Sequence, residues 1–330
     1  MKQAKRHKKA VSKHRSARRK TVVNHAAQPK LSQALDLEEL LVKSLLNQSK
    51  GLKDGIVVED LIYSLTPKLA RTAYNFGYSI GRSIFANSQR WENTLIPALG
   101  RLGFRYIKYY PFRDALAISL ESRNPGITNI GARIHSFESG IIAGYLSAHS
   151  GEAINTVEKE CVYHGDKACR FVSYTGRILR ESSSPSLEDV IDAIATSMRE
   201  IKFSNRSDTE YHMLPLILMT KQPLRSEVAK IFYLTGLELS QRHRKEDMED
   251  ILRNIARYFG VTKESVSVAP KNATVELNYA YHNSNADFVE LSTAMIRGVI
   301  KGRTSKEPNV YINVDKNKNY VVDITTAVRK

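Results

Sequence analysis

Both cysteines of this 330-residue chain lie in one short segment, with a glutamate just ahead of them. Cys161 and Cys169 are eight positions apart, and Glu158 precedes the first cysteine by three positions. Zinc prefers thiolate, imidazole and carboxylate ligands, and a Gly165-Asp166 turn would fold two strands back so that their side chains converge. The spacing therefore predicts that Glu158, Cys161 and Cys169 ligate a metal ion.

A four-coordinate site needs one more ligand, and the spacing leaves its identity open. The upstream candidates are His135, Glu138 and His149, and His164 is a local alternative inside the loop. The two cysteines could instead pack as small buried apolar residues or form a local disulfide. Two cysteines are too few for a secreted disulfide scaffold of this length, and the charged start of the chain has no apolar signal core. A cytoplasmic, reducing location is therefore expected, which favours a metal over a bridge.

A longer pattern surrounds the cysteines. The segment 140–146 reads Gly-Ile-Ile-Ala-Gly-Tyr-Leu, and the string from Glu158 to Phe171 reads Glu-x-x-Cys-x-x-x-Gly-Asp-x-x-Cys-x-Phe. Over roughly residues 67–175, this pattern resembles the 4-vinyl-reductase domain family, which includes the ligand-sensing domains of bacterial aromatic-responsive regulators. The resemblance implies a ligand-sensing module and a homodimer formed through this part of the chain.

The resemblance also implies which residue completes the site. In the aromatic sensors of the family, the equivalent glutamate and two cysteines bind zinc together with a further cysteine upstream. Here His135 falls at the matching distance, and imidazole can replace thiolate at zinc. The implied zinc ligands are His135, Glu158, Cys161 and Cys169. Four protein ligands leave no open coordination position, so the implied ion is structural rather than catalytic.

Positive charge is concentrated at the start of the chain. The formal net charge is +16, and residues 1–20 hold ten Lys or Arg and no acidic residue. Such a tail cannot bury an apolar core, so we expect it to be disordered in isolation. It should bind RNA, most plausibly on a ribosomal surface, or DNA, by neutralising phosphates with steep salt dependence. The residues expected to contact phosphate are Lys2, Lys5, Arg6, Lys8, Lys9, Lys13, Arg15, Arg18, Arg19 and Lys20.

Other roles for the tail stay open. It could aid solubility, meet an acidic protein or lie on an anionic membrane surface, although it lacks the interleaved Trp, Phe or Leu that would insert among headgroups. The absence of aromatic residues argues against base stacking and sequence-specific reading. No run approaches the roughly 20 apolar residues that cross a bilayer, so no membrane span is expected.

Periodicity places the elements that must position these residues. Helices are expected at 35–46, 58–64, 67–88, 93–102 and 133–149, and strands at 104–110, at 115–121 and on both sides of the cysteine loop. Gly51 and Gly55 are expected to break the first helix. Small residues recur every three to four positions from Ala70 to Gly81, which predicts that another backbone approaches this face of the long helix closely.

The second half of the chain repeats the order of the first. The matching segments are 229–236 with 70–77, 251–260 with 95–103, and 275–279 with the strand near Leu116, followed by a helix at 286–301 and strands at 310–314 and 320–324. The repeat predicts an α+β fold of two tandem modules, each with helices packed on an antiparallel sheet, although two ordinary units could share this order by chance. Asp315 would fall near the place of Glu158, but nothing replaces either cysteine.

The predicted units follow from these patterns. They are a basic disordered tail (1–30), a helical lead-in (31–66), a zinc module resembling the 4-vinyl-reductase domain (67–178), a linker and helix (179–202), and a degenerate second module without metal ligands (203–330).

The motifs exclude the common kinds of active site. The chain has no glycine-rich phosphate loop, nucleophile elbow or His-Glu-x-x-His helix, so we do not expect an enzyme. A zinc-containing scaffold that associates with nucleic acid ranks first. The alternative is a sensor whose apolar cleft, rimmed by Tyr106, Tyr109 and Tyr110, binds a small hydrophobic or aromatic ligand. This alternative is weaker because no ATPase or DNA-reading module accompanies the domain.

Overall fold

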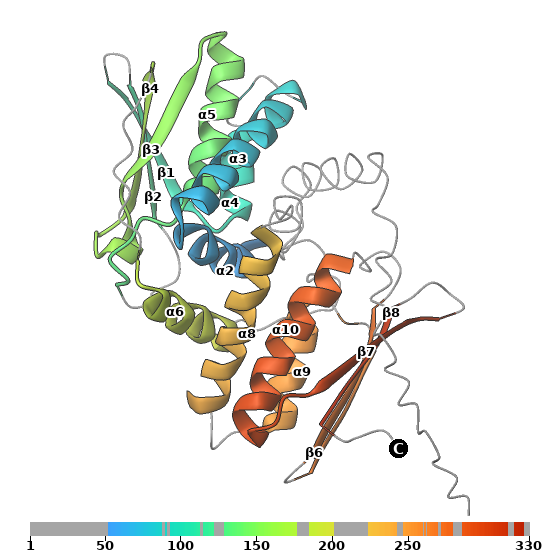
Figure 1. The fold of residues 1–330 in the computed structure, drawn as a ribbon. Helices are drawn as coiled ribbons and strands as arrows, with labels where there is room; N and C mark the ends of the chain where they lie inside the picture. The colour runs from blue at the N-terminus through green and yellow to red at the C-terminus, as the bar shows by residue number, and fades with distance from the viewer. Residues whose placement is uncertain are drawn as a thin grey trace, which may run out of the picture.

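Helices and antiparallel sheets alternate along the chain in two similar halves (Figure 1). The computed structural model describes residues 52–87, 90, 93–112, 115–121, 129–176, 185–200, 224–242, 247–259, 261, 263–269, 272–279, 286–315 and 320–326. The predicted tail and the helix expected at 35–46 lie outside the described residues. Within them the fold is α+β, as predicted. No helix in the described ranges is both long and apolar enough to cross a membrane.

The first module packs three helices on one face of a four-stranded sheet (Figure 1). The helices are α3 (Pro67–Asn87), α4 (Leu95–Arg101) and α5 (Ser136–Ser150), and the strands are β1 (Arg105–Phe112), β2 (Ala115–Glu121), β3 (Ile154–Glu160) and β4 (Cys169–Thr175). The strand order is β1-β2-β4-β3, and every pairing is antiparallel. Along β4, Cys169, Phe171 and Ser173 are buried, whereas Arg170 is exposed. This alternation is the period of two that gives a sheet one core-facing side.

The second module has the same order of elements and the same sheet topology. Its helices are α8 (Leu224–Arg242), α9 (Met248–Tyr258) and α10 (Ala286–Thr304), and its strands are β5 (Lys263–Ala269), β6 (Asn272–Tyr279), β7 (Asn309–Val314) and β8 (Tyr320–Thr325). The strand order is β5-β6-β8-β7, with antiparallel pairing throughout. The predicted pair of tandem modules is therefore present as a repeated architecture. The boundary predicted at residue 203 lies outside the described residues.

Two further helices connect the modules. Helix α6 (Leu187–Glu200) packs against both α2 (Leu52–Ser64) in front of the first module and α8 in the second. Gly51 and Gly55 were expected to break the helix before them. For Gly55 this was wrong, because it lies inside α2, and Gly51 is outside the described residues. Glycine costs a helix only about 1 kcal/mol, and the fully buried Val58, Leu61 and Ile62 on the same helix outweigh that cost.

Helices α3 and α5 touch through their backbones at glycine positions. A Cβ atom on Gly77 would collide with the carbonyl oxygen of Phe137, and one on Gly140 would collide with the carbonyl oxygen of Tyr74. The small-residue stripe of α3 therefore does bring another backbone close, as predicted. The second module repeats the contact, because a Cβ on Gly236 of α8 would collide with the backbone of α10.

Candidate metal centre

Four elements of the first module carry the candidate ligands. His135 is the N-cap residue of α5, Glu158 lies near the end of β3, and Cys169 begins β4. Cys161 follows β3 and precedes a 3-10 turn, Val162–His164. Glu158 pairs with Phe171 across the two strands, so the hairpin register places the glutamate and both cysteines at the same end of the sheet.

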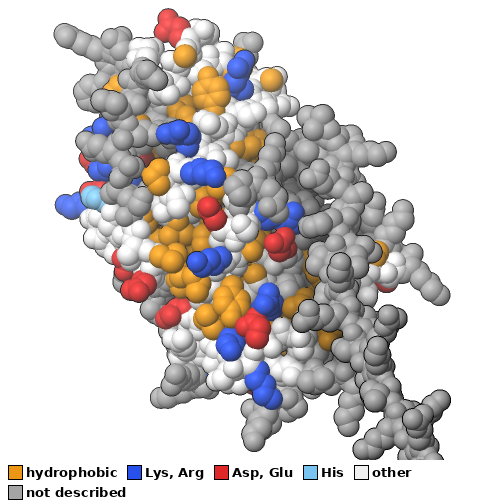
Figure 2. All heavy atoms as spheres, in the orientation of Figure 1, with side chains coloured by type: hydrophobic (Ala, Val, Ile, Leu, Met, Phe, Trp, Pro, Cys, Tyr) orange, Lys and Arg blue, Asp and Glu red, His pale blue; other side chains and the backbone are white. Residues whose placement is uncertain are grey.

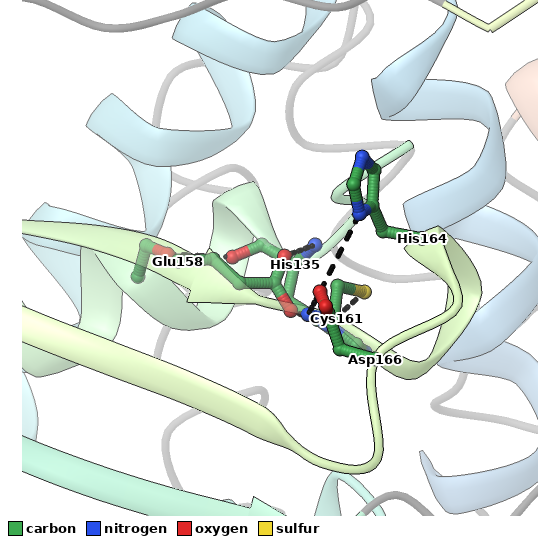
Figure 3. A network of polar contacts seen from close by, with 6 residues as sticks. His135, Glu158, Cys161, His164 and Asp166 are labelled. Carbon is green, nitrogen blue, oxygen red and sulfur yellow. Dashed lines mark hydrogen bonds and ion pairs between the residues drawn. The ribbon is translucent and has the colours of Figure 1, made fainter. Parts of the chain in front are cut away.

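The loop between the cysteines is held by Asp166 (Figure 3). Its Oδ2 accepts a hydrogen bond of 2.8 Å from the backbone N–H of Cys161. The carbonyl of Cys161 in turn accepts hydrogen bonds from the N–H groups of His164 and Asp166. Gly165 has φ 100°, a left-handed conformation that glycine adopts without strain. The predicted Gly165-Asp166 turn thus fixes the backbone from which Cys161 projects.

The four donor groups meet at one point. One ligand atom from each of His135, Glu158, Cys161 and Cys169 lies within 4.8 Å of all the others, and the cluster could hold a metal ion. His135 Nδ1 is 2.6 Å from Glu158 Oε1 and 3.6 Å from Cys161 Sγ. The backbone N–H of His135 also donates a 3.1 Å hydrogen bond to Glu158 Oε2. The structure therefore brings together all four residues that the sequence implied.

The spacing of these donors fits a tetrahedral zinc ion in part. Zinc bond lengths of about 2.3 Å to sulfur and 2.0–2.1 Å to nitrogen put those two ligands about 3.6 Å apart in a tetrahedron, which is the observed separation of Cys161 Sγ and His135 Nδ1. The His135–Glu158 hydrogen bond is shorter than the corresponding nitrogen–oxygen edge of about 3.4 Å. A zinc ion would therefore replace that hydrogen bond and move the two atoms apart.

The cluster is closed off from solvent. Both cysteines are fully buried, and the side chains of His135 and Glu158 are 4% and 5% exposed. The rings of Phe104, Tyr163 and Phe171 surround the imidazole of His135, with centroids 5.2, 5.7 and 6.1 Å away. Both thiols are free, which excludes the local disulfide in this structure. The arrangement suits an ion that only protein groups ligate.

Without a cation, two of the four donor groups are stabilised in their protonated forms. Burial lowers the pKa of His135, but the nearby Glu158 and Cys161 more than offset it, and the pKa is raised well above its usual value. Burial also raises the pKa of the Cys161 thiol, with smaller contributions from the hydrogen bond to Cys169 and the charge of Glu158. Both groups therefore hold protons at neutral pH. A divalent cation would displace these protons and stabilise the thiolate.

This proton displacement predicts a steep pH dependence of metal affinity. His135 and Cys161 each release a proton when the metal binds, so acidification favours the protonated, metal-free form. We expect metal affinity to fall about tenfold per displaced proton, and therefore at least a hundredfold between pH 7 and pH 6, because the second cysteine must also bind as a thiolate. Competition with a chelator calibrated at each pH would measure the change. Equal affinity at both values would show that these two groups are not ligands.

The other predicted ligand candidates do not join the cluster. His149 is exposed at the end of α5, where its ring contacts Phe85. His164 Nδ1 lies 3.4 Å from Asp166 Oδ2, as Figure 3 shows, so this histidine is directed toward the loop carboxylate. Glu138 is fully buried but is not part of the donor group. The alternatives left open by spacing are thereby reduced to His135.

Glu138 belongs instead to a group of buried acids that the sequence interpretation missed. It interacts with Asp60 of α2, and burial followed by the charge of Glu138 raises the pKa of Asp60 well above its usual value. The adjacent Glu59 is fully buried and accepts a 2.6 Å hydrogen bond from Tyr63. The available signal was the pair Glu59-Asp60 within the otherwise apolar stretch from Ile56 to Ile62.

The comparisons with known proteins name no activity. No protein-family model matches the chain. The uncharacterized protein MJ0150 of Methanocaldococcus jannaschii is 28% identical over 105 residues, which cover 30% of this chain and 61% of that protein. The chain thus spans less than two thirds of the length of this relative. The resemblance to 4-vinyl-reductase domains therefore stays a prediction.

The described part of the second module holds no equivalent centre. Both cysteines of the chain belong to the first module. Asp315 comes directly after β7, as Cys161 comes directly after β3, so by strand position it corresponds to Cys161 rather than to Glu158. Within the described part of the chain, the only group of His, Cys, Asp and Glu that could hold a metal ion is the one in the first module.

The predicted ligand cleft is not tested by the structure. Tyr106, Tyr109 and Tyr110 all lie on β1. Their side chains fall outside the described part of the structure, and the cleft that they would rim remains a prediction.

Proposed function

We propose that this protein is a non-enzymatic binding scaffold whose first module is stabilised by a structural zinc ion and whose basic N-terminal tail attaches it to RNA or DNA. The observation that carries the zinc part is the convergence of four buried donors, each from a different segment of the first module. Two thiolates, one imidazole and one carboxylate form a ligand set that suits zinc, and they would complete its tetrahedral coordination.

A structural role follows from the closed surroundings. Catalytic zinc keeps a position for water or substrate, whereas four protein donors behind an aromatic wall leave none. When bound, zinc would link the N-terminus of α5 to the β3–β4 hairpin, two segments that are joined here through His135 and Glu158. Asp166 would support the site from outside by holding the backbone of Cys161.

The nucleic-acid part is supported by charge distribution. On the face shown in Figure 2, basic and acidic side chains of the described residues are interspersed. Residues 1–20 hold ten of the 50 Lys and Arg residues with no acid. The tail therefore offers the most concentrated positive charge in the sequence, and phosphate neutralisation is the chemistry that such a segment supports.

Deleting residues 1–20 is expected to abolish nucleic-acid binding and leave the metal in place. Each phosphate contact that the tail makes to duplex DNA should add about 0.9 to the slope of log affinity against log salt. The matched control is the full-length chain with the ten basic residues changed to glutamine, which should behave like the deletion. Binding that survives both changes would assign nucleic-acid contact to another surface or show that there is none.

One experiment separates the two parts of the proposal. The untagged protein would be purified, its metal content measured by elemental analysis, and its bound nucleic acid followed by absorbance before and after a high-salt wash. About one zinc per chain with salt-removable RNA or DNA is the expected result. Zinc without nucleic acid would retain the structural site and leave the ligand-sensing alternative as the better function. A protein without metal would overturn the zinc assignment.

A further inference from the structure

The edge strand β7 carries exposed apolar side chains. It is the last strand of the second sheet and pairs only with β8 among the described strands. Ile312 and Val314 are 52% and 58% exposed. Ile312 lies opposite the fully buried Val322, so it is on the core-facing side of the sheet and yet remains uncovered.

In the first module, helix α5 covers β3, which is the strand that corresponds to β7. There α5 packs against β3, whereas in the second module the strands that α10 contacts most are β6 and β8. The sequences of the two edges differ as well: β3 reads Ile-Asn-Thr-Val-Glu-Lys-Glu, and β7 reads Asn-Val-Tyr-Ile-Asn-Val without a charge. Exposed edges normally carry charges or proline to prevent pairing with another chain. Strand β7 has neither protection.

The sequence of β7 is also complementary to itself. If two copies pair antiparallel with Ile312 on the two-fold axis, Ile312 faces its own equivalent, and Val310 faces Val314 of the second copy. All the side chains on that face are then apolar, and the other face sets Tyr311 opposite Asn313 of the second copy. No like charges meet in this register.

We infer that β7 is the contact through which two copies of this chain form a homodimer, joining their second sheets into one continuous eight-stranded sheet. The contact would satisfy the outer backbone groups of β7 and shield Ile312 and Val314 from water. A single strand pair is a small interface, so dissociation is expected in the micromolar range. This inference does not depend on the zinc or nucleic-acid proposals, because it concerns only the second module.

A cross-link at the two-fold axis tests the register. The variant Ile312→Cys places two thiols opposite each other and should form a disulfide-linked dimer under mild oxidation, since paired residues in adjacent strands are close enough to bridge. Asn313→Cys is the matched control, because Asn313 faces Tyr311 rather than its own equivalent, and it should cross-link far less. The native thiols are fully buried and should not contribute.

Light scattering across a micromolar concentration series tests the dimer itself. The natural sequence should approach twice the 37.3 kDa chain mass at high concentration. Ile312→Lys should remain monomeric with an unchanged circular dichroism spectrum, because the exposed position tolerates lysine but pairing would oppose two positive charges. A natural protein that stays monomeric, a dimer unaffected by Ile312→Lys, or equal cross-linking at both cysteine positions would overturn the inference.

Discussion

Replacing Cys161 or Cys169 with serine is expected to remove the bound metal and to lower the free energy of unfolding by about 4 kcal/mol. That value is the stabilisation given by a ligand present at a thousand times its dissociation constant. Serine is a poor zinc ligand, so the metal would be lost. The remaining buried polar donors would then have no cation. Denaturant unfolding with and without a chelator, combined with elemental analysis, measures both effects.

Chelation and two glutamate substitutions serve as controls for the serine variants. A chelator should lower the stability of the natural protein toward that of the serine variants and should hardly change the variants themselves. Glu158→Gln should also lose the metal, whereas Glu160→Gln should keep it, because Glu160 is two residues away, half-exposed and paired with Arg170. Metal retained in both serine variants, or a natural protein indifferent to chelation, would contradict the predicted site.

The candidate ligand cluster could be predicted because the local sequence and the turn chemistry agree. The Glu158–Phe171 string places three donors around one hairpin, and hairpin register is short-range information. His135 lies 23 residues before Glu158 and reaches the site through the packing of α5, so spacing alone could not select it among several candidates. Only the family resemblance indicated it.

The burial of the acidic residues could not be predicted from the local sequence. Asp60 and Glu138 lie far apart in sequence, and both are buried at the contact between α2 and α5. A charged pair such as Glu59-Asp60 ordinarily predicts an exposed helix face. Its burial depends on tertiary packing around the first module. The exposure of the core-facing side of β7 could not be predicted either, because an alternating strand pattern does not say whether a helix will cover it.

The candidate metal site and the exposed strand β7 occupy equivalent hairpins of the two modules. The same element order produces a covered hairpin with a candidate metal site in the first module, and in the second module a hairpin whose uncharged edge strand β7 is uncovered. What the two modules share is the close pairing of their long helices through glycine. That contact, rather than the metal, is therefore the feature on which the architecture depends in both halves.

Gly140→Ala is accordingly expected to destabilise the protein by about 2 kcal/mol, although alanine is the better helix former. The added Cβ would collide with the backbone carbonyl of Tyr74, which no change of rotamer can avoid, so α3 and α5 must separate. Overpacking costs about 1–3 kcal/mol, and a collision with backbone atoms belongs at the upper end of that range. Subtracting about 1 kcal/mol for the better helix propensity of alanine leaves a net loss of about 2 kcal/mol. Chemical denaturation at a fixed metal concentration measures the change.

Gly100→Ala supplies the matched control for this contact. Gly100 lies in α4, and a Cβ built there meets no atom within 4 Å. Alanine at this position should therefore leave stability unchanged or raise it by up to about 1 kcal/mol. Gly140→Ala should still bind one metal ion per chain, because the ligands lie on other residues. If both substitutions stabilised the protein equally, the predicted collision between α3 and α5 would be wrong. If Gly140→Ala destabilises the protein and Gly100→Ala does not, the loss comes from the helix contact and not from helix propensity.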